Sequence, residues 1–148
     1  MSKILFGELP SGEKVFIYQL KDGNSNVEIM EFGAAIVSLR PFGETDVVGG
    51  FDSLDDYLVD TSNQGAVVGR VANRIENAEF CIDGAIYHLC KNDNGNCLHS
   101  GIGFQHRLWK VEAQAENSIT LSYFSPCGED GFPSNLVVRV KYTLKNNA

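Results

Sequence analysis

Hydrophobic and polar positions alternate along most of this chain, and short groups of turn residues separate the alternating segments. Alternation with a period of two is typical of β-strands that bury one face. The pattern predicts strands at 13–20, 26–31, 33–39, 78–82, 85–90, 108–114, 118–124 and 136–144. Many short strands at this spacing predict an all-β protein built as a β-sandwich or barrel.

One hairpin turn and one short helix stand out within this pattern. Asp83-Gly84 separates two predicted strands, and this dipeptide suits the positive φ angles of a tight hairpin turn. The segment 53–60 reads SLDDYLVD, with Ser53 as an N-cap and acidic residues in the first turn. We therefore expect at most one short helix.

The carboxyl end of the chain predicts an unfinished sheet. The last predicted strand runs into residues 145–148, where Asn-Asn suits the start of a hairpin turn. No returning strand follows in the sequence. We therefore expect residues 1–148 to be a portion of a larger domain that is cut at a hairpin. Its open sheet edge is a candidate surface for self-association or for pairing with another chain.

Composition and charge narrow the class of protein. Of the 148 residues, 43% are hydrophobic and 21% charged, which is ordinary for a globular domain. The net charge of -7 argues against nucleic acid and anionic membranes as partners. No apolar run suits a signal peptide or a membrane span, so we expect a cytoplasmic protein. A reducing cytoplasm favours free thiols for its cysteines, which are Cys81, Cys90, Cys97 and Cys127.

Two arginines and a histidine are candidates for ligand binding. Arg70 and Arg74 lie four residues apart in an irregular segment, where a guanidinium suits a polyhydroxylated or anionic ligand. The alternative for either arginine is an ion pair with a surface carboxylate. His99 follows a turn-like run, and a loop imidazole can exchange a proton near neutral pH. We expect His88 to lie in a strand as a packing or surface residue, and His106 to be solvated.

A metal site or a catalytic nucleophile has little support in the sequence. The cysteines and histidines form no CxxC or HxxxH pair, so no metal ligand set is predicted. No nucleophile elbow precedes a helix either.

Seven segments, in order, resemble one family. They read FGAAIVSL, VVGGFDSLDDYL, GRVANRI, FCIDGAIYHL, NCLHSGIGF, RLWKVE and SPCGEDGFPSNLVVRVKYTL. Together they cover most of the chain, which resembles the aldose 1-epimerase (galactose mutarotase) family. The resemblance implies a β-sandwich of the galactose-mutarotase type. It also implies an enzyme that interconverts the α and β anomers of free hexoses, such as galactose and glucose, without a cofactor.

The same resemblance assigns the candidate site. It implies that Asn73, Arg74 and His99 contact the substrate, and that His99 lies near the ring oxygen of the sugar as a catalytic group. Under this assignment Arg74, rather than Arg70, is the substrate-binding arginine.

The chain also departs from the family. The Asn-His-x-Tyr-Phe segment that supplies the acid histidine, and the late glutamate that supplies the base, have no counterpart here. Anomer exchange needs one group to remove a proton and another to donate one. Three hypotheses follow for residues 1–148: the amino-terminal portion of an aldose 1-epimerase, a non-catalytic carbohydrate-binding half-domain, or an interaction module.

Overall fold

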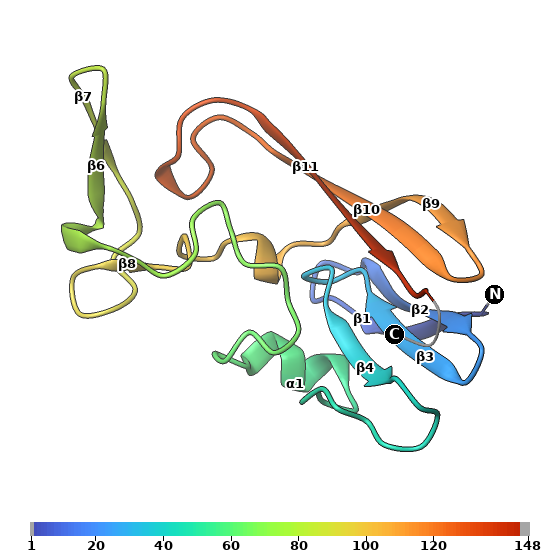
Figure 1. Cartoon of the computed structure of the whole chain (residues 1–148). Coiled ribbons are helices and arrows are strands. Elements are labelled where there is room, and N and C mark those ends of the chain that lie inside the picture. Colours follow the sequence, from blue (N-terminus) through green and yellow to red (C-terminus); the bar gives the residue numbers. More distant parts are fainter. Residues whose placement is uncertain (1, 146–148) are drawn as a thin grey trace.

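Two antiparallel sheets form the main body of the chain (Figure 1). The computed structural model describes residues 2–145. The first sheet has the order β1-β2-β3-β4, from β1 (Ser2–Glu8), β2 (Lys14–Asp22), β3 (Ser25–Met30) and β4 (Ile36–Arg40). The second has the order β11-β10-β9, from β9 (Lys110–Ala115), β10 (Ser118–Ser125) and β11 (Leu136–Thr143). The predicted all-β class is confirmed.

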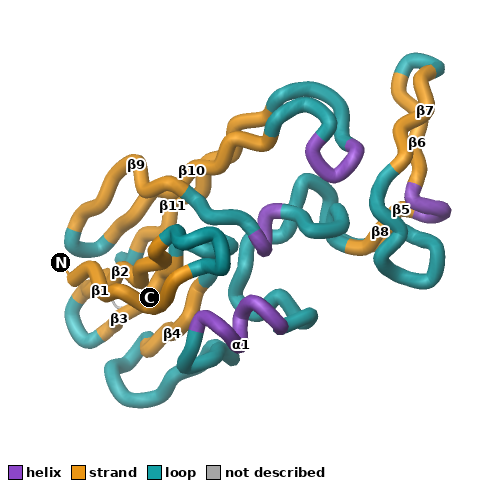
Figure 2. Tube along the Cα trace, turned by 180° about the vertical axis from the view of Figure 1, so that it is seen from behind, coloured by secondary structure: helices purple, strands orange, loops and turns teal. Residues whose placement is uncertain are grey.

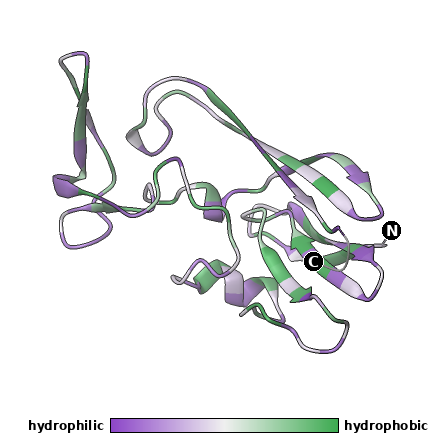
Figure 3. Ribbon diagram, in the orientation of Figure 1, coloured by the Kyte–Doolittle hydropathy of each residue, from purple (hydrophilic) through white to green (hydrophobic). Residues whose placement is uncertain are grey.

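The main core fills the space between these two sheets, and the alternation along β2 explains why. Tyr18 and Leu20 point to one face of β2 and join a cluster with Leu121 of the second sheet and with Trp109, which directly precedes β9. All four side chains are buried. Figure 3 shows hydrophobic residues interspersed with polar ones along the strands of both sheets. Burial of the apolar set from both sheets drives their packing.

A second cluster lies on the opposite face of the first sheet. Val15 and Ile17, which alternate with the residues of the main core along β2, pack there against Leu54 and Tyr57 of the helix α1 (Leu54–Val59). Ser53 caps this helix, because its Oγ accepts a hydrogen bond from the backbone N–H of Asp56 at 3.3 Å. The single short helix that the sequence predicts is therefore confirmed.

Two smaller sheets lie beside the main body (Figure 2). Strand β5 (Arg74–Ile75) pairs with β8 (Cys97–Leu98), and β6 (Glu79–Ile82) forms a hairpin with β7 (Ala85–His88). The predicted Asp83-Gly84 turn closes this hairpin, with positive φ at both residues. In Figure 1 the hairpin stands apart from the two main sheets.

Short 3₁₀ turns and a third cluster join these elements. The turns are η1 (Glu76–Ala78), η2 (Phe104–His106) and η3 (Glu129–Gly131). The cluster consists of buried side chains from the base of the β6–β7 hairpin, from β8 and from the loop after β10, namely Ala78, Leu89, Cys97 and Phe132. It anchors the hairpin at its base only.

The structure departs from the predicted strands at several positions, among them β1, β4 and β7. The pattern missed β1, because its apolar residues Ile4 and Leu5 are consecutive and exposed; pairing with β2 makes this segment a strand. Strand β4 starts at Ile36 rather than at Gly33, because Gly33 and Ala34 have positive φ. Strand β7 ends at His88, where the chain turns into the third cluster. Of the turn predicted at 145–148, residues 146–148 lie outside the described part.

Within residues 2–145, no helix is both long enough and apolar enough to cross a bilayer.

Candidate functional site

The pairing of β5 with β8 brings two of the predicted site residues together. Arg74 lies opposite Leu98 in this register, so the preceding Asn73 meets the following His99 across the ladder. The backbone N–H of His99 donates to the Asn73 carbonyl oxygen at 3.1 Å. The backbone N–H of Asn73 donates in turn to Nδ1 of His99 at 3.0 Å. Two residues that are 26 positions apart are thus locked to each other.

This reciprocal pair decides the tautomer of His99. A ring nitrogen that accepts a hydrogen bond carries no proton, so the proton of the neutral imidazole lies on Nε2. His99 is half-buried, and its Nε2–H is its remaining hydrogen-bond donor. The imidazole is therefore oriented by the backbone to donate, through Nε2, to an acceptor outside the β5–β8 ladder.

The backbone around His99 adopts a conformation that L-residues seldom choose. The φ angles of Asn73, His99 and Ser100 are 67°, 52° and 64°. Asparagine and histidine are enriched in this left-handed region among the non-glycine residues, whereas serine is not. Side-chain hydrogen bonds hold the turn. Ser100 Oγ accepts from Val71 N–H at 2.7 Å and donates to the Val71 carbonyl at 3.0 Å, and Gln105 Nε2 donates to the His99 carbonyl at 3.0 Å. Such locally strained, well-held residues are concentrated at functional sites.

Arg74 extends from the same short ladder. The Asn73 side chain accepts the backbone N–H of Arg74 at 2.8 Å, which orients the Asn73 amide. The Arg74 guanidinium forms an ion pair through Nε with Asp93, which lies in the turn between β7 and β8. The side chain of Arg74 is 56% exposed, so the guanidinium is open to solvent on the side that Asp93 does not occupy. Asp93 thus fixes the direction of an arginine that can still bind a ligand.

Arg70 has a different role from Arg74. Its Nε donates to Ser125 Oγ, its Nη1 to the Pro133 carbonyl, and its Nη2 to the carbonyls of Ser125, Pro126 and Ser134, at distances of 2.7–3.1 Å. Every nitrogen of this guanidinium is used within the protein. Arg70 is therefore a structural residue that holds the loop between β10 and β11.

The loop between β10 and β11 holds the segment that follows His99. Asp130 accepts the backbone N–H of Gly103 at 3.1 Å and forms an ion pair with Arg107 at 3.2 Å. Glu129 accepts hydrogen bonds from Tyr123 and Ser125. Burial and the hydrogen bond to Glu129 raise the pKa of Tyr123 to about 12, so this phenol remains a donor at neutral pH. Arg70 and Arg107 therefore both hold the loop between β10 and β11 in place.

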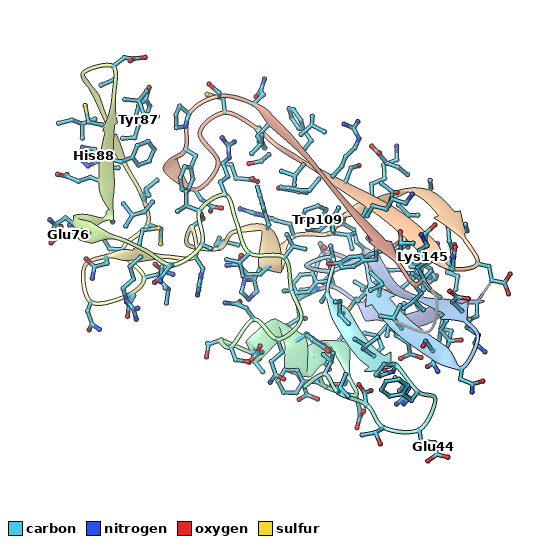
Figure 4. All side chains as sticks on the ribbon, in the orientation of Figure 1. Glu44, Glu76, Tyr87, His88, Trp109 and Lys145 are labelled. Atoms are coloured by element: carbon cyan, nitrogen blue, oxygen red, sulfur yellow. The ribbon has the colours of Figure 1, made fainter. Side chains whose placement is uncertain are left out.

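The other histidines lie away from this ladder. His88 is in β7 on the outlying hairpin, with a 76% exposed side chain beside Glu79 (Figure 4). This location agrees with the surface role expected from the sequence. His106 differs from its expected solvated state, because it is half-buried, with Nδ1 3.0 Å from the Ile102 carbonyl oxygen and its ring against Phe32. Neither approaches the predicted site residues through a hydrogen bond in the described part of the chain.

The part of the chain that the structure describes contains no set of side chains suited to bind a metal ion. No group of three or more His, Cys, Asp and Glu side chains between residues 2 and 145 could hold an ion. The cysteines are free thiols, three exposed and Cys97 buried.

Thiol reactivity is expected to follow this difference in burial. Burial, and the neighbouring thiol of Cys90, raise the pKa of Cys97, so its thiolate is scarce as well as inaccessible. A colorimetric disulfide reagent at pH 8 should titrate Cys81, Cys90 and Cys127 rapidly, and Cys97 only after denaturation. Four fast thiols in the native protein would contradict the packing of the third cluster.

Comparison with known proteins identifies the family. The model of the aldose 1-epimerase family matches residues 17–148. The chain belongs to the aldose 1-epimerase family. It is 43% identical over 150 residues to galactose mutarotase of Rattus norvegicus. This match covers 97% of this chain and 44% of the rat protein. It is 37% identical over 139 residues to aldose 1-epimerase of Haemophilus influenzae, covering 91% of this chain and 41% of that protein. The chain thus spans less than half the length of these curated relatives.

Solved structures of this family share the fold. Galactose 1-epimerase from Lactobacillus acidophilus superimposes with a TM-score of 0.86 at 22% identity, over 98% of this chain and 44% of that chain. The aldose epimerase homologue from Caenorhabditis elegans gives 0.81 at 30% identity, over 86% and 41% of the two chains. The predicted sandwich of the galactose-mutarotase type is therefore confirmed.

Sequence reasoning missed the residues that support the site. Ser100, Gln105 and Asp130 act through backbone groups of Val71, His99 and Gly103, and no spacing in the sequence indicates such contacts. In the sequence, Asp93 is only part of a turn-like run. Its ion pair with Arg74 is the kind of contact that the alternative for either arginine predicts, a pairing with a surface carboxylate.

Proposed function

We propose that this chain provides the sugar-binding part of an aldose 1-epimerase that interconverts the α and β anomers of free hexoses such as galactose. Family membership supports this proposal. The observation that carries it is the hydrogen bond from the Asn73 backbone to His99 Nδ1, which leaves Nε2–H as an oriented donor. A sugar ring oxygen is an acceptor that this donor suits.

The proposed division of labour follows from the chemistry of ring opening. The ring oxygen gains negative charge as its bond to the anomeric carbon breaks, so a fixed donor stabilises it most in the transition state. His99 would donate there, while the Asn73 amide and the Arg74 guanidinium would hold neighbouring hydroxyl groups. Asn73 and Arg74 are exposed and His99 is half-buried, so the sugar would be held from one side.

A complete reaction also needs a base for the anomeric hydroxyl. In the described structure no aspartate or glutamate is hydrogen bonded to His99, and Asp93, the carboxylate nearest to the site by contact, is paired with Arg74. The Asp93 carboxylate is thus already used to hold Arg74. We therefore assign binding and ring-oxygen stabilisation to this chain, and not the proton abstraction.

The 148-residue chain alone is expected to show no measurable acceleration of α-D-galactose mutarotation over buffer, because an oriented hydrogen-bond donor at His99 replaces neither the base nor the proton-transferring acid that the reaction needs. Polarimetry of freshly dissolved α-D-galactose measures this rate. A rate well above that of buffer that disappears in His99→Asn would mean that a base lies within this chain and that the division of labour is wrong.

A further inference from the structure

The turn between β7 and β8 carries the only Asn-Gly dipeptide of the chain, Asn94-Gly95. It forms a two-residue hairpin loop, because Asp93 and Asn96 on either side of it exchange backbone hydrogen bonds of 3.1 and 2.9 Å. The φ angles of Asn94 and Gly95 are 48° and 87°, as a tight turn of this kind requires. Both residues are exposed, so water and hydroxide reach the dipeptide.

The side chain of Asn94 is held less firmly than those of the other asparagines in this turn. The Asn92 amide donates to the Leu98 carbonyl at 2.9 Å and accepts from the Leu98 N–H at 2.7 Å. The side-chain oxygen of Asn96 accepts a backbone N–H at 3.0 Å. In the described structure the Asn94 side chain has one hydrogen bond, from Nδ2 to Asp93 at 3.4 Å. The Asn94 amide can therefore rotate toward its own backbone.

Gly95 supplies a nucleophile for this amide. Among the described residues, none accepts a hydrogen bond from the Gly95 N–H. No atom outside its chain neighbours lies within 4 Å of the position that a Cβ of Gly95 would occupy. Once hydroxide removes the N–H proton, the nitrogen can bond to the side-chain carbonyl carbon of Asn94, and ammonia leaves from that carbon. Water then opens the resulting succinimide ring at either carbonyl. One opening yields aspartate, and the other yields isoaspartate, in which the chain continues through the side chain.

We propose that Asn94 is a site of spontaneous covalent modification, and that its conversion to isoaspartate releases Arg74 from Asp93. The Asp93 carboxylate accepts hydrogen bonds from Asn94 Nδ2 and from Arg74 Nε. Isoaspartate adds a methylene group to the backbone of the two-residue loop. The backbone hydrogen bonds between Asp93 and Asn96 then no longer fit the loop, and Asp93 loses the position from which it holds the guanidinium.

Ageing of the purified 148-residue chain at pH 8 tests the modification without any sugar. Peptide mapping by mass spectrometry should show the exchange of NH2 for OH at Asn94, and isoaspartyl methyltransferase should label the same peptide. The rate should fall in more acidic buffer, because hydroxide removes the proton from the Gly95 nitrogen. Asn77 is the internal control, since it is exposed with a φ of 54° but precedes the buried Ala78. It should stay unmodified while Asn94 converts.

NMR of the Arg74 Nε–H group tests the consequence for the ion pair. The isoaspartate form should show a shifted Arg74 Nε–H resonance with faster solvent exchange, since Nε is the atom that pairs with Asp93. Asn94→Asp carries the new charge without the additional methylene, so its resonance should stay close to that of the fresh chain. Asn94→Gly suits the positive φ but lacks the amide, so its spectrum should not change on ageing.

Three outcomes would overturn the proposal. They are no conversion at Asn94, conversion at Asn77 as fast as at Asn94, and an unchanged Arg74 Nε–H resonance in the isoaspartate form.

The effect on sugar binding rests on the proposed function, in which Arg74 contacts the hexose. Isoaspartate should weaken D-galactose binding about 3-fold, within the range of a lost exposed ion pair. A released Arg74 with unchanged galactose affinity would support the modification and contradict the sugar-binding role of Arg74, so the two proposals fail separately.

Discussion

His99→Asn is expected to lower kcat for mutarotation about 10²-fold in a fusion of this chain to the unmatched part of rat galactose mutarotase. The imidazole presents Nε2–H because the Asn73 backbone occupies Nδ1. An asparagine side chain is shorter and would not bring its amide donor to the position of Nε2–H beside the ring oxygen. Because the lost interaction strengthens in the transition state, kcat should fall more than KM rises. Coupled spectrophotometric assays of β-D-galactose formation measure both constants.

The same substitution at the other histidines provides the control. His88 is exposed on the hairpin and His106 packs against Phe32, so His88→Asn and His106→Asn should stay near the wild-type rate. Equal losses in all three variants would indicate damage to folding. The assignment of His99 to the sugar would then have to be abandoned.

Arg70→Ala is expected to lower the free energy of unfolding by about 2–3 kcal/mol. Its guanidinium donates to Ser125 Oγ and to four loop carbonyls, which lose a charged donor in the variant. Arg74→Ala should change stability by no more than about 1 kcal/mol, because the Arg74 side chain is 56% exposed and ion pairs at the surface contribute little. Urea denaturation followed by Trp109 fluorescence measures both values.

For sugar binding, Arg74 should matter more than Arg70, which is the reverse of their expected order for stability. Arg74→Lys keeps the charge but loses the planar pair of donors, so it should weaken hexose binding by the fusion protein while stability is unchanged. A large loss of stability in Arg74→Ala, together with none in Arg70→Ala, would contradict the roles assigned to these residues.

Alternation along the chain was sufficient to predict most of the main body. One set of alternating residues is buried between the two sheets in each of four strands, namely β2, β3, β10 and β11. The alternation of hydrophobic and polar residues is therefore visible in their sequences. β1 lacks that signal, because its strand character comes from pairing with β2 and not from burial. β5 and β8 have two residues each, which is too short for any period to appear.

The geometry of the candidate site depends on these short strands. Family resemblance suggested Asn73, Arg74 and His99, but the contact between Asn73 and His99 arises from the β5–β8 pairing across 26 residues. The left-handed backbone of His99 and Ser100 was also beyond sequence reasoning, since serine does not favour positive φ and even histidine adopts it in only a small fraction of cases. The Ser100 hydroxyl, bonded to the Val71 backbone, and the Gln105 amide, bonded to the His99 carbonyl, stabilise that conformation only after the segments have met.

The central claim is that His99 presents an oriented hydrogen-bond donor to a hexose. Nitrogen-15 NMR of the histidine rings during a D-galactose titration tests this claim most directly. In the 148-residue chain, the account predicts an unprotonated Nδ1 and a protonated Nε2 for His99. Addition of sugar should shift the His99 Nε2 resonance and leave both ring nitrogens of His88 unchanged. A proton on Nδ1 of His99, or a galactose response at His88 and none at His99, would contradict the account.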